Sequence, residues 1–328
     1  MNTKLKCRSF LTLNDVSNEE MMYLLDLAEK LKQKKKDGKI GDLLAGKHVA
    51  MIFEKMSTRT RCAVAVALAD EGGRTEYLSA GEMHLGQKES TADTARVLGR
   101  MFDGIFFRGF SQETVEVLSK HAGVPVWNGL TDECHPTQIL ADLLTMKEKF
   151  GEIKGLKLVY IGDGRNNVAN SLMLGCAKTG VHFVNCTPKE LMPSSELVEQ
   201  AKNIAQTSGG SVAVVNDPSE GVAGANAVYT DVWASMGEES KLAERIQLLQ
   251  PYQVNMDLIR KTGNLEEDKI IFLHCLPALH DKNTEITKDT GALEVTDDVF
   301  EAPFSMVFEE TENRVHTIKA LLVASLCD

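Results

Sequence analysis

Short apolar runs alternate with longer segments of helical periodicity along most of this chain. Apolar runs bounded by turn residues are typical of buried strands, and apolar residues recurring every three to four positions are typical of helices. In the first half we predict strands at 48–53, 74–78, 104–108 and 125–129, and helices at 58–71, 91–102, 111–122 and 136–150. In the second half we predict strands at 156–161, 181–186, 211–215, 227–230 and 270–273, and helices at 166–179, 194–207 and 309–326.

The order of these elements predicts an α/β fold with two tandem parallel-sheet domains. Strands that alternate with helices form parallel sheets covered by helices on both faces. The glycine-flanked stretch 151–155 separates the two series, so we place a boundary after residue 150 and a second domain at 151–309. Such folds bind ligands at the carboxyl ends of their strands, and two domains in tandem predict a cleft for two substrates.

Composition narrows the class of protein. Of 328 residues, 43% are hydrophobic and 25% charged, as in ordinary globular proteins. No apolar run approaches the length of a membrane span, and residues 1–6 lack the apolar segment of a signal peptide, so we expect a cytoplasmic protein without a membrane partner. Seven cysteines without a Cys-x-x-Cys pair argue against a disulfide framework or a structural zinc site.

The net charge of −11 argues against nucleic acid as a partner. It also means that an anionic substrate must be held by a local cluster of positive groups. Residues 57–61 supply such a cluster, because they place two arginines and three hydroxyls between a predicted strand and a predicted helix. Ser57 is a natural N-cap, and the helix start offers unpaired N–H groups. Arg59 and Arg61 would repel this positive helix end unless an anion, such as a phosphate, lay between them.

Other polar residues follow predicted strands in the same way. Arg108 ends the strand at 104–108, although a charge in that place is often only a strand terminus. His135 and Gln138 begin a predicted helix whose first residue is Pro136, and their spacing places them on one side of the first turn. A histidine beside a helix N-terminus has a lowered pKa, which favours a neutral ring that donates a hydrogen bond.

The second half carries three further candidates. The segment 162–167 resembles a dinucleotide-binding fingerprint with Asn167 in place of the third glycine, which counts against NAD; an Asn-Asn pair there can instead bind a carboxylate or an amino group. Asp231 follows an apolar run and would pair with a cation. Cys275 ends a strand before Pro277, where a thiol is either inert packing or a group of the site.

Together these segments resemble the ornithine carbamoyltransferases (ornithine transcarbamylases) of the aspartate/ornithine carbamoyltransferase superfamily. The resemblance covers almost the whole chain. Ser-Thr-Arg-Thr-Arg and His-Pro-x-Gln are shared across carbamoyltransferases, whereas Ser-Met-Gly and His-Cys-Leu-Pro select ornithine. The matching segments are 53–61, 84–90, 93–98, 135–138, 231–237, 274–277 and 312–317.

The resemblance implies that carbamoyl phosphate and L-ornithine react to give L-citrulline and phosphate, in arginine biosynthesis or in the arginine deiminase pathway. It implies that the enzyme needs no metal or organic cofactor and that it forms a homotrimer. It also implies a carbamoyl-phosphate domain at 1–150, with the C-terminal helix of 310–328 packed on it, and an ornithine domain at 151–309. It assigns carbamoyl phosphate to Ser57, Thr58, Arg59, Thr60, Arg108, His135, Gln138, Cys275, Leu276 and Arg314, with His84 from a neighbouring subunit. It assigns ornithine to Asn167, Asp231, Ser235 and Met236, and the chemistry to Arg108, His135, Asp231 and Cys275.

Three alternatives stay open at this point. A related transferase that acts on aspartate would need a cation for the second carboxylate of that substrate, and Ser235-Met236-Gly237 does not supply one. A transferase that acts on putrescine would leave Asn167 without a partner, because putrescine has no α-carboxylate. An NAD-dependent oxidoreductase is weakened by the altered glycine fingerprint. A non-catalytic ligand-binding homologue is opposed by the presence of Arg59, Arg108, His135 and Cys275.

Overall fold

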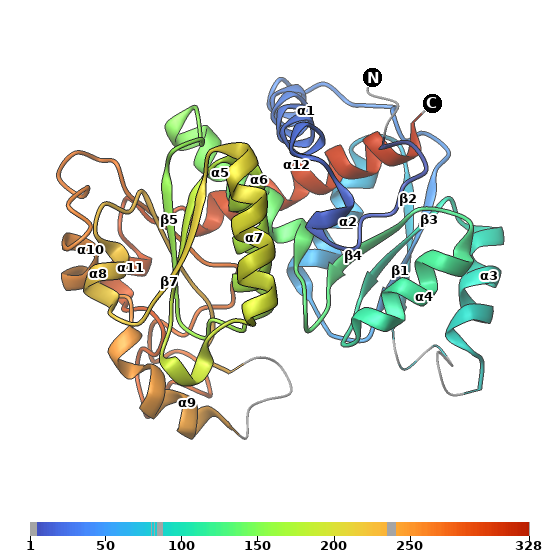
Figure 1. Ribbon diagram of the computed structural model, residues 1–328. Coiled ribbons are helices and arrows are strands. Elements are labelled where there is room, and N and C mark those ends of the chain that lie inside the picture. The colour runs from blue at the N-terminus through green and yellow to red at the C-terminus, as the bar shows by residue number, and fades with distance from the viewer. Residues whose placement is uncertain (1–4, 80, 82, 84–87, 235–240, 328) are drawn as a thin grey trace. The chain divides into compact units, whose positions relative to one another are not determined.

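The computed structural model describes residues 5–79, 81, 83, 88–234 and 241–327 (Figure 1). The chain divides into two compact units, of which unit 1 comprises Met1–Leu144 with Thr311–Asp328 and unit 2 comprises Thr145–Glu310. Within the described ranges, we find no helix with the length and apolar character needed to cross a membrane.

The described part of unit 1 holds one parallel sheet with the strand order β2-β1-β3-β4. The strands are β1 (His48–Phe53), β2 (Arg74–Ser79), β3 (Gly104–Arg108) and β4 (Val126–Leu130). The helices are α1 (Asn18–Lys36), α2 (Thr58–Ala69), α3 (Thr91–Met101) and α4 (Gln112–Ala122), with most of α5 (Pro136–Phe150) and α12 (Val307–Leu326). Strand β2 lies on one side of β1, whereas β3, the next strand along the chain, lies on the other side. The topological switch point is therefore between β1 and β3.

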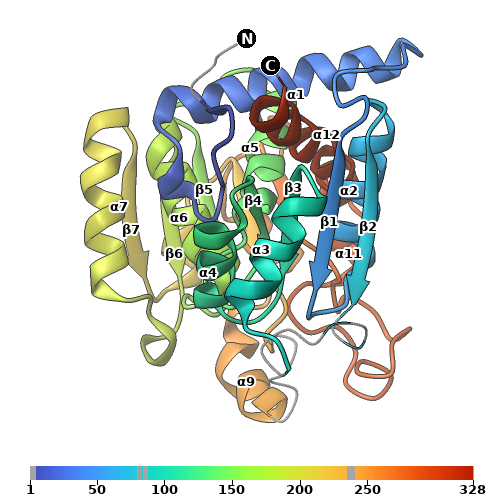
Figure 2. The same cartoon turned by 90° about the vertical axis from the view of Figure 1, so that its right-hand side faces the viewer.

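The two faces of this sheet are covered by different helices (Figure 2). Alternate residues of β1 and β3, such as Ile52 and Phe107, form an apolar cluster with Leu98 of α3 and Leu118 of α4. Burial on both faces explains why the central strands are apolar at nearly every position.

The C-terminal helix packs within unit 1, as the resemblance implies. The indole Nε1 of Trp127 donates to Ser325 Oγ over 3.2 Å. Lys319 Nζ lies 2.7 Å from Asp70 Oδ2, and this lysine is 1% exposed. These bonds hold α12 against β4 and α2, and so fix the position of Arg314 on the same helix.

The described part of unit 2 holds a second parallel sheet, with the order β7-β6-β5-β8-β9. The strands are β5 (Lys157–Ile161), β6 (His182–Cys186), β7 (Ser211–Val215), β8 (Ala227–Thr230) and β9 (Ile271–Leu273). The helices are α6 (Asn167–Thr179), α7 (Ser195–Ser208), α8 (Pro218–Val222), α9 (Leu242–Leu249), α10 (Met256–Arg260) and α11 (Asp297–Phe300). The switch point of this sheet lies between β5 and β8, where ligands bind in folds of this kind.

Every strand and helix predicted from the sequence is present, with ends within two residues of the predicted ones. The expectation of two parallel-sheet α/β domains is therefore confirmed. Helix α1 and the short helices α8 to α11 were not predicted.

Candidate active site

In unit 1, polar side chains gather at the switch point between β1 and β3. Ser57 caps α2, and its Oγ accepts a hydrogen bond of 3.2 Å from the backbone N–H of Thr60. This bond fixes the first turn of α2 directly after β1, so its remaining N–H groups and its positive dipole end lie at the carboxyl edge of the sheet. Thr58 is exposed on this turn, and the predicted N-cap is confirmed.

Two arginines reach this edge from other elements. Arg314 of α12 is 3% exposed, and its Nη2 donates to Thr60 Oγ1 over 2.8 Å. Arg108 ends β3 next to Phe53 of β1, and it is also buried. Two buried guanidinium groups beside a helix N-terminus form a strongly positive cluster, which suits a multiply charged anion.

His135 shows that these charges converge. Its ring is 3% exposed, and its pKa is held well below 6.5 by burial first and then by the positive charges of Arg314, Arg108 and Arg59. The three arginines come from segments far apart in the sequence, yet all act on one imidazole. The ring is therefore neutral near pH 7, and the causes are burial and the arginine charges, which the sequence analysis did not consider for this residue.

Gln138 lies one turn into α5, which begins at Pro136 as predicted. Its side chain is 1% exposed, and its Nε2 donates to Asp142 Oδ1 over 2.8 Å. That bond orients the amide, so Gln138 presents Oε1 as the acceptor end. An acceptor beside a neutral histidine suits a ligand that carries an amide N–H.

Arg61 does not join the other arginines, although the sequence analysis placed it with Arg59 around an anion. Its guanidinium lies over the ring of Tyr77 at 3.9 Å from the centroid, and the residue is exposed. Arg61 thus makes a cation–π contact with β2, and the arginines that act on His135 are Arg59, Arg108 and Arg314.

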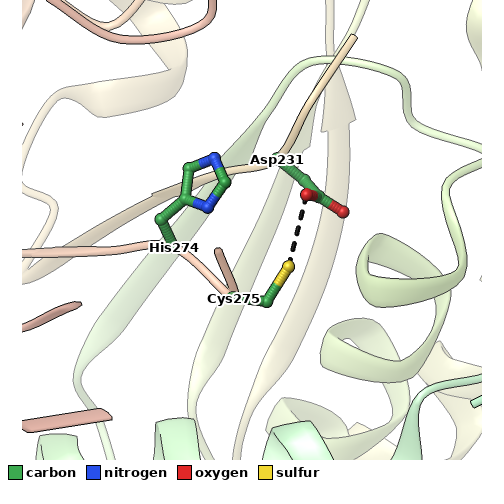
Figure 3. A group of neighbouring side chains, drawn as sticks. All are labelled: Asp231, His274 and Cys275. Carbon is green, nitrogen blue, oxygen red and sulfur yellow. Dashed lines mark hydrogen bonds between the residues drawn. The ribbon is translucent and has the colours of Figure 1, made fainter. Parts of the chain in front are cut away.

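In unit 2, Asp231 and Cys275 meet beside the switch point between β5 and β8 (Figure 3). Asp231 follows β8 and is 7% exposed. Figure 3 shows the Cys275 thiol pointing toward the Asp231 carboxylate, with Sγ 3.2 Å from Oδ1. A carboxylate and a thiol that lie side by side can accept hydrogen bonds from an amine and so orient it.

A buried network shapes the turn that carries Cys275 and Leu276. The Leu276 N–H donates to His274 Nδ1 over 2.9 Å, while His274 Nε2 lies 3.4 Å from Glu294 Oε1. Burial alone would lower the pKa of His274, but the hydrogen bond and charge of Glu294 outweigh it and raise that pKa. Leu276 itself has a φ of +58°, in the left-handed region.

The predicted ornithine residues are only partly within the described ranges. Asn167 is the first residue of α6 and is half-buried, whereas its neighbour Asn166 bonds to Asp231, with Nδ2 to Oδ2 at 3.0 Å. The sequence analysis considered the Asn-Asn pair of 166–167 as a substrate-binding group but assigned ornithine to Asn167 alone. Ser235 and Met236 lie outside the described residues, as does His84 of the first half.

Two groups of side chains in the described ranges have ligand types that suit a metal ion. Asp231, His274 and Cys275 have ligand atoms within 4.8 Å of one another, and so do His280, Asp297 and Glu301. In the first group the same side chains already form hydrogen bonds, because His274 Nδ1 accepts from Leu276 and Cys275 donates to Asp231. A metal would have to displace these bonds. In the second group, His280 Nδ1 bonds to Asp297 and its ring stacks on Phe300.

Comparison with known proteins covers both units. Residues 8–148 match the aspartate/ornithine carbamoyltransferase, carbamoyl-P binding domain, and residues 154–325 match the Asp/Orn binding domain of the same family. The catabolic ornithine carbamoyltransferase of Bacillus licheniformis is 56% identical over 99% of this chain and 98% of its own length. The ornithine carbamoyltransferase of Streptococcus pyogenes serotype M5 is 55% identical over 97% of this chain and 96% of its own length.

Solved structures agree. The ornithine carbamoyltransferase from Pyrococcus furiosus is 44% identical, with a TM-score of 0.90 over 98% of both chains. The anabolic ornithine carbamoyltransferase from Campylobacter jejuni is 34% identical, with a TM-score of 0.85 over 96% of this chain and 97% of its own. This chain therefore belongs to the ornithine carbamoyltransferases of the aspartate/ornithine carbamoyltransferase family.

Proposed function

We propose that this protein transfers the carbamoyl group of carbamoyl phosphate to the δ-amine of L-ornithine, giving L-citrulline and phosphate. The observation that carries the proposal is the neutral, buried ring of His135 within the field of Arg59, Arg108 and Arg314. The arginines supply charge for a phosphate, and the neutral ring supplies an uncharged hydrogen-bond donor for a carbonyl oxygen. Carbamoyl phosphate carries both groups on one molecule.

In the proposed reaction the amine nitrogen attacks the carbamoyl carbon and a new C–N bond forms. The carbonyl π electrons move to oxygen, and Arg108, His135 and the Thr60 hydroxyl can stabilise the resulting negative charge. Preorganised donors of this kind are usually the largest catalytic contribution. The carbonyl π bond then re-forms as the C–O bond to phosphate breaks, and the leaving phosphate takes the bonding electrons toward Arg59 and Arg314. The proton lost from the amine passes to the leaving phosphate.

In unit 2 the polar groups suit the second substrate. Asp231 and Cys275 would orient the amino-acid substrate and its amine, and the carbonyl of Leu276 would accept from the attacking nitrogen. We further propose that residues 1–150 with 310–328 bind carbamoyl phosphate and that residues 151–309 bind ornithine. Reaction then requires the amine and the carbamoyl carbon to approach to about 3–3.5 Å.

The test is a citrulline assay on the purified protein with carbamoyl phosphate and one amine at a time. We expect ornithine to react far faster than putrescine, aspartate or lysine. Equal rates with putrescine would overturn the choice of ornithine, and no carbamoyl transfer to any amine would overturn the transferase activity. The Arg108→Ala variant serves as the control for activity from contaminating enzymes.

We also propose that the protein acts as a homotrimer in which His84 of one subunit completes the site of the next. The support is the resemblance of residues 84–90 to the corresponding family motif. His84→Ala and Arg108→Ala chains, unfolded and refolded together, should then form some sites with both residues intact. Recovered activity well above the parental average supports the shared site. Activity equal to that average, in mixtures shown to have exchanged subunits, places the site within one chain.

A further inference from the structure

The Asp231 carboxylate is held in one orientation by three donors. Its Oδ1 accepts from the Val232 N–H at 2.8 Å and from Cys275 Sγ at 3.2 Å, and its Oδ2 accepts from Asn166 Nδ2 at 3.0 Å. Because different donors hold the two oxygens, the plane of the carboxylate cannot rotate without breaking a bond. Asn166 is the only one of these three donors that engages Oδ2.

Asn166 is itself fixed in a single orientation. It caps α6, and its Oδ1 accepts from the Val168 N–H at 2.7 Å. Its own N–H donates to the carbonyl oxygen of Asp163 at 3.0 Å. Since the cap uses the amide oxygen, the amide nitrogen must face Asp231. The capping bond therefore decides which end of the amide reaches the site.

The loop that carries Asn166 is anchored by an ion pair from a different helix. Arg245 of α9 places Nη1 2.9 Å from Asp163 Oδ2, and the two side chains are only 9% and 13% exposed. Arg165 also bonds to Asp163, but its side chain is 47% exposed. Breaking a buried pair is costly because it leaves a charge without its partner, whereas an exposed pair contributes little.

We propose that Asn166, anchored through Asp163 by Arg245, is a positioning residue that orients Asp231 for ornithine. The connection runs through described contacts from α9 to the β5–α6 loop, and from there to the end of β8. The sequence analysis assigned no role to Asp163 or Arg245, and it considered Asn166 only as half of a pair that could bind substrate directly. The inference rests on the proposed function, because it assumes that Asp231 binds ornithine.

Asn166→Ser is the deciding variant. Serine caps a helix about as well as asparagine, so α6 keeps its cap, but the short hydroxyl cannot reach Asp231. A lost hydrogen bond to a charged group predicts a fall of about tenfold to a hundredfold in kcat/KM for ornithine. The loss should lie mainly in the ornithine KM. Carbamoyl phosphate affinity, measured by calorimetric titration, should match that of the wild type. The melting temperature should fall only modestly, because Asp231 loses one of its three donors while α6 keeps its cap.

Arg245→Met and Arg165→Met form a matched pair, since both remove a cation from Asp163. We expect Arg245→Met to lower kcat/KM for ornithine about tenfold and Arg165→Met to change it less than about twofold. Asn166→Asp is a second variant at the cap. It keeps the capping oxygen but turns an acceptor toward Asp231, so it should impair ornithine use at least as much as serine does.

The outcomes separate this inference from the proposed function. A wild-type protein that forms no citrulline refutes the function. A wild-type protein that is active, with Asn166→Ser unchanged in ornithine kcat/KM, refutes the positioning role. Equal losses of carbamoyl phosphate affinity and ornithine use in Asn166→Ser also refute it, because they indicate a general structural defect.

Discussion

Replacing His135 with alanine should slow carbamoyl transfer by about 10²–10³-fold, which corresponds to about 2.7–4 kcal/mol of transition-state stabilisation. The ring is buried and neutral among three arginines, so it can donate to a developing oxyanion without adding to the positive charge that surrounds it. His135→Gln retains an uncharged donor and should lose less than the alanine variant. Single-turnover citrulline formation with both substrates saturating measures the difference.

The pH dependence tests the same reasoning. Because burial and the nearby arginines hold the pKa of His135 well below 6.5, the ring stays neutral through the neutral and alkaline range. The rate should instead rise with pH, because only the neutral amine attacks and a lysine-like amine has a pKa near ~10. Wild type and His135→Gln should therefore give profiles of the same shape, displaced by a constant factor.

His121 is the matched control, since it lies in the same unit at the end of α4 and away from the arginines that act on His135. His121→Ala should keep the wild-type rate. A His135→Ala rate within about fivefold of the wild type would refute the donor role. An inflection near pH 6.5 that is present in the wild type and lost in His135→Gln would refute the neutral state.

Three further outcomes are expected. Arg59→Ala should weaken carbamoyl phosphate binding in calorimetric titration, whereas Cys275→Ala should leave that binding nearly intact and impair ornithine use; equal loss in both would contradict this division. Asp70→Ala should lower the free energy of unfolding by about 3 kcal/mol, measured in urea, because it leaves the buried Lys319 without its partner. Burial and the charge of Lys319 lower the pKa of His316 to about 4, so stability should fall as pH drops from about 6.5 toward 4, and less steeply in His316→Gln.

The strands were predictable because parallel strands buried on both faces leave a continuous apolar run in the sequence. Strands β1, β3 and β7 have the predicted bounds. Helix α1 was missed although its signal is present: Ser17 and Glu20 form a capping box directly before an amphipathic segment. Helices α8, α10 and α11, of four or five residues, are too short to show a period in sequence.

Arg108 and Asp231 could be named as candidates from the sequence because each stands at or directly after the end of its own strand. Their partners could not, because these come from segments far apart in the chain. Asn166, which bonds to Asp231, lies 65 residues from it. An Asn-Asn pair also gives no local sign of which amide faces inward, since the start of α6 decides that.

The overall negative charge of this protein repels an anionic substrate, whereas the local cluster of arginines attracts it. The fold explains how the local attraction can prevail. A net charge of −11 repels an anionic substrate at long range, but salt screens that repulsion beyond about 8–10 Å. Arg108 and Arg314 are buried, so their fields are screened much less. Burial first, and then this concentration of positive groups, disfavours a further cation and lowers the pKa of His135. If these arginines bind the phosphate as proposed, the charges that attract the substrate also help burial to keep His135 neutral, and binding and catalysis then share one electrostatic cause.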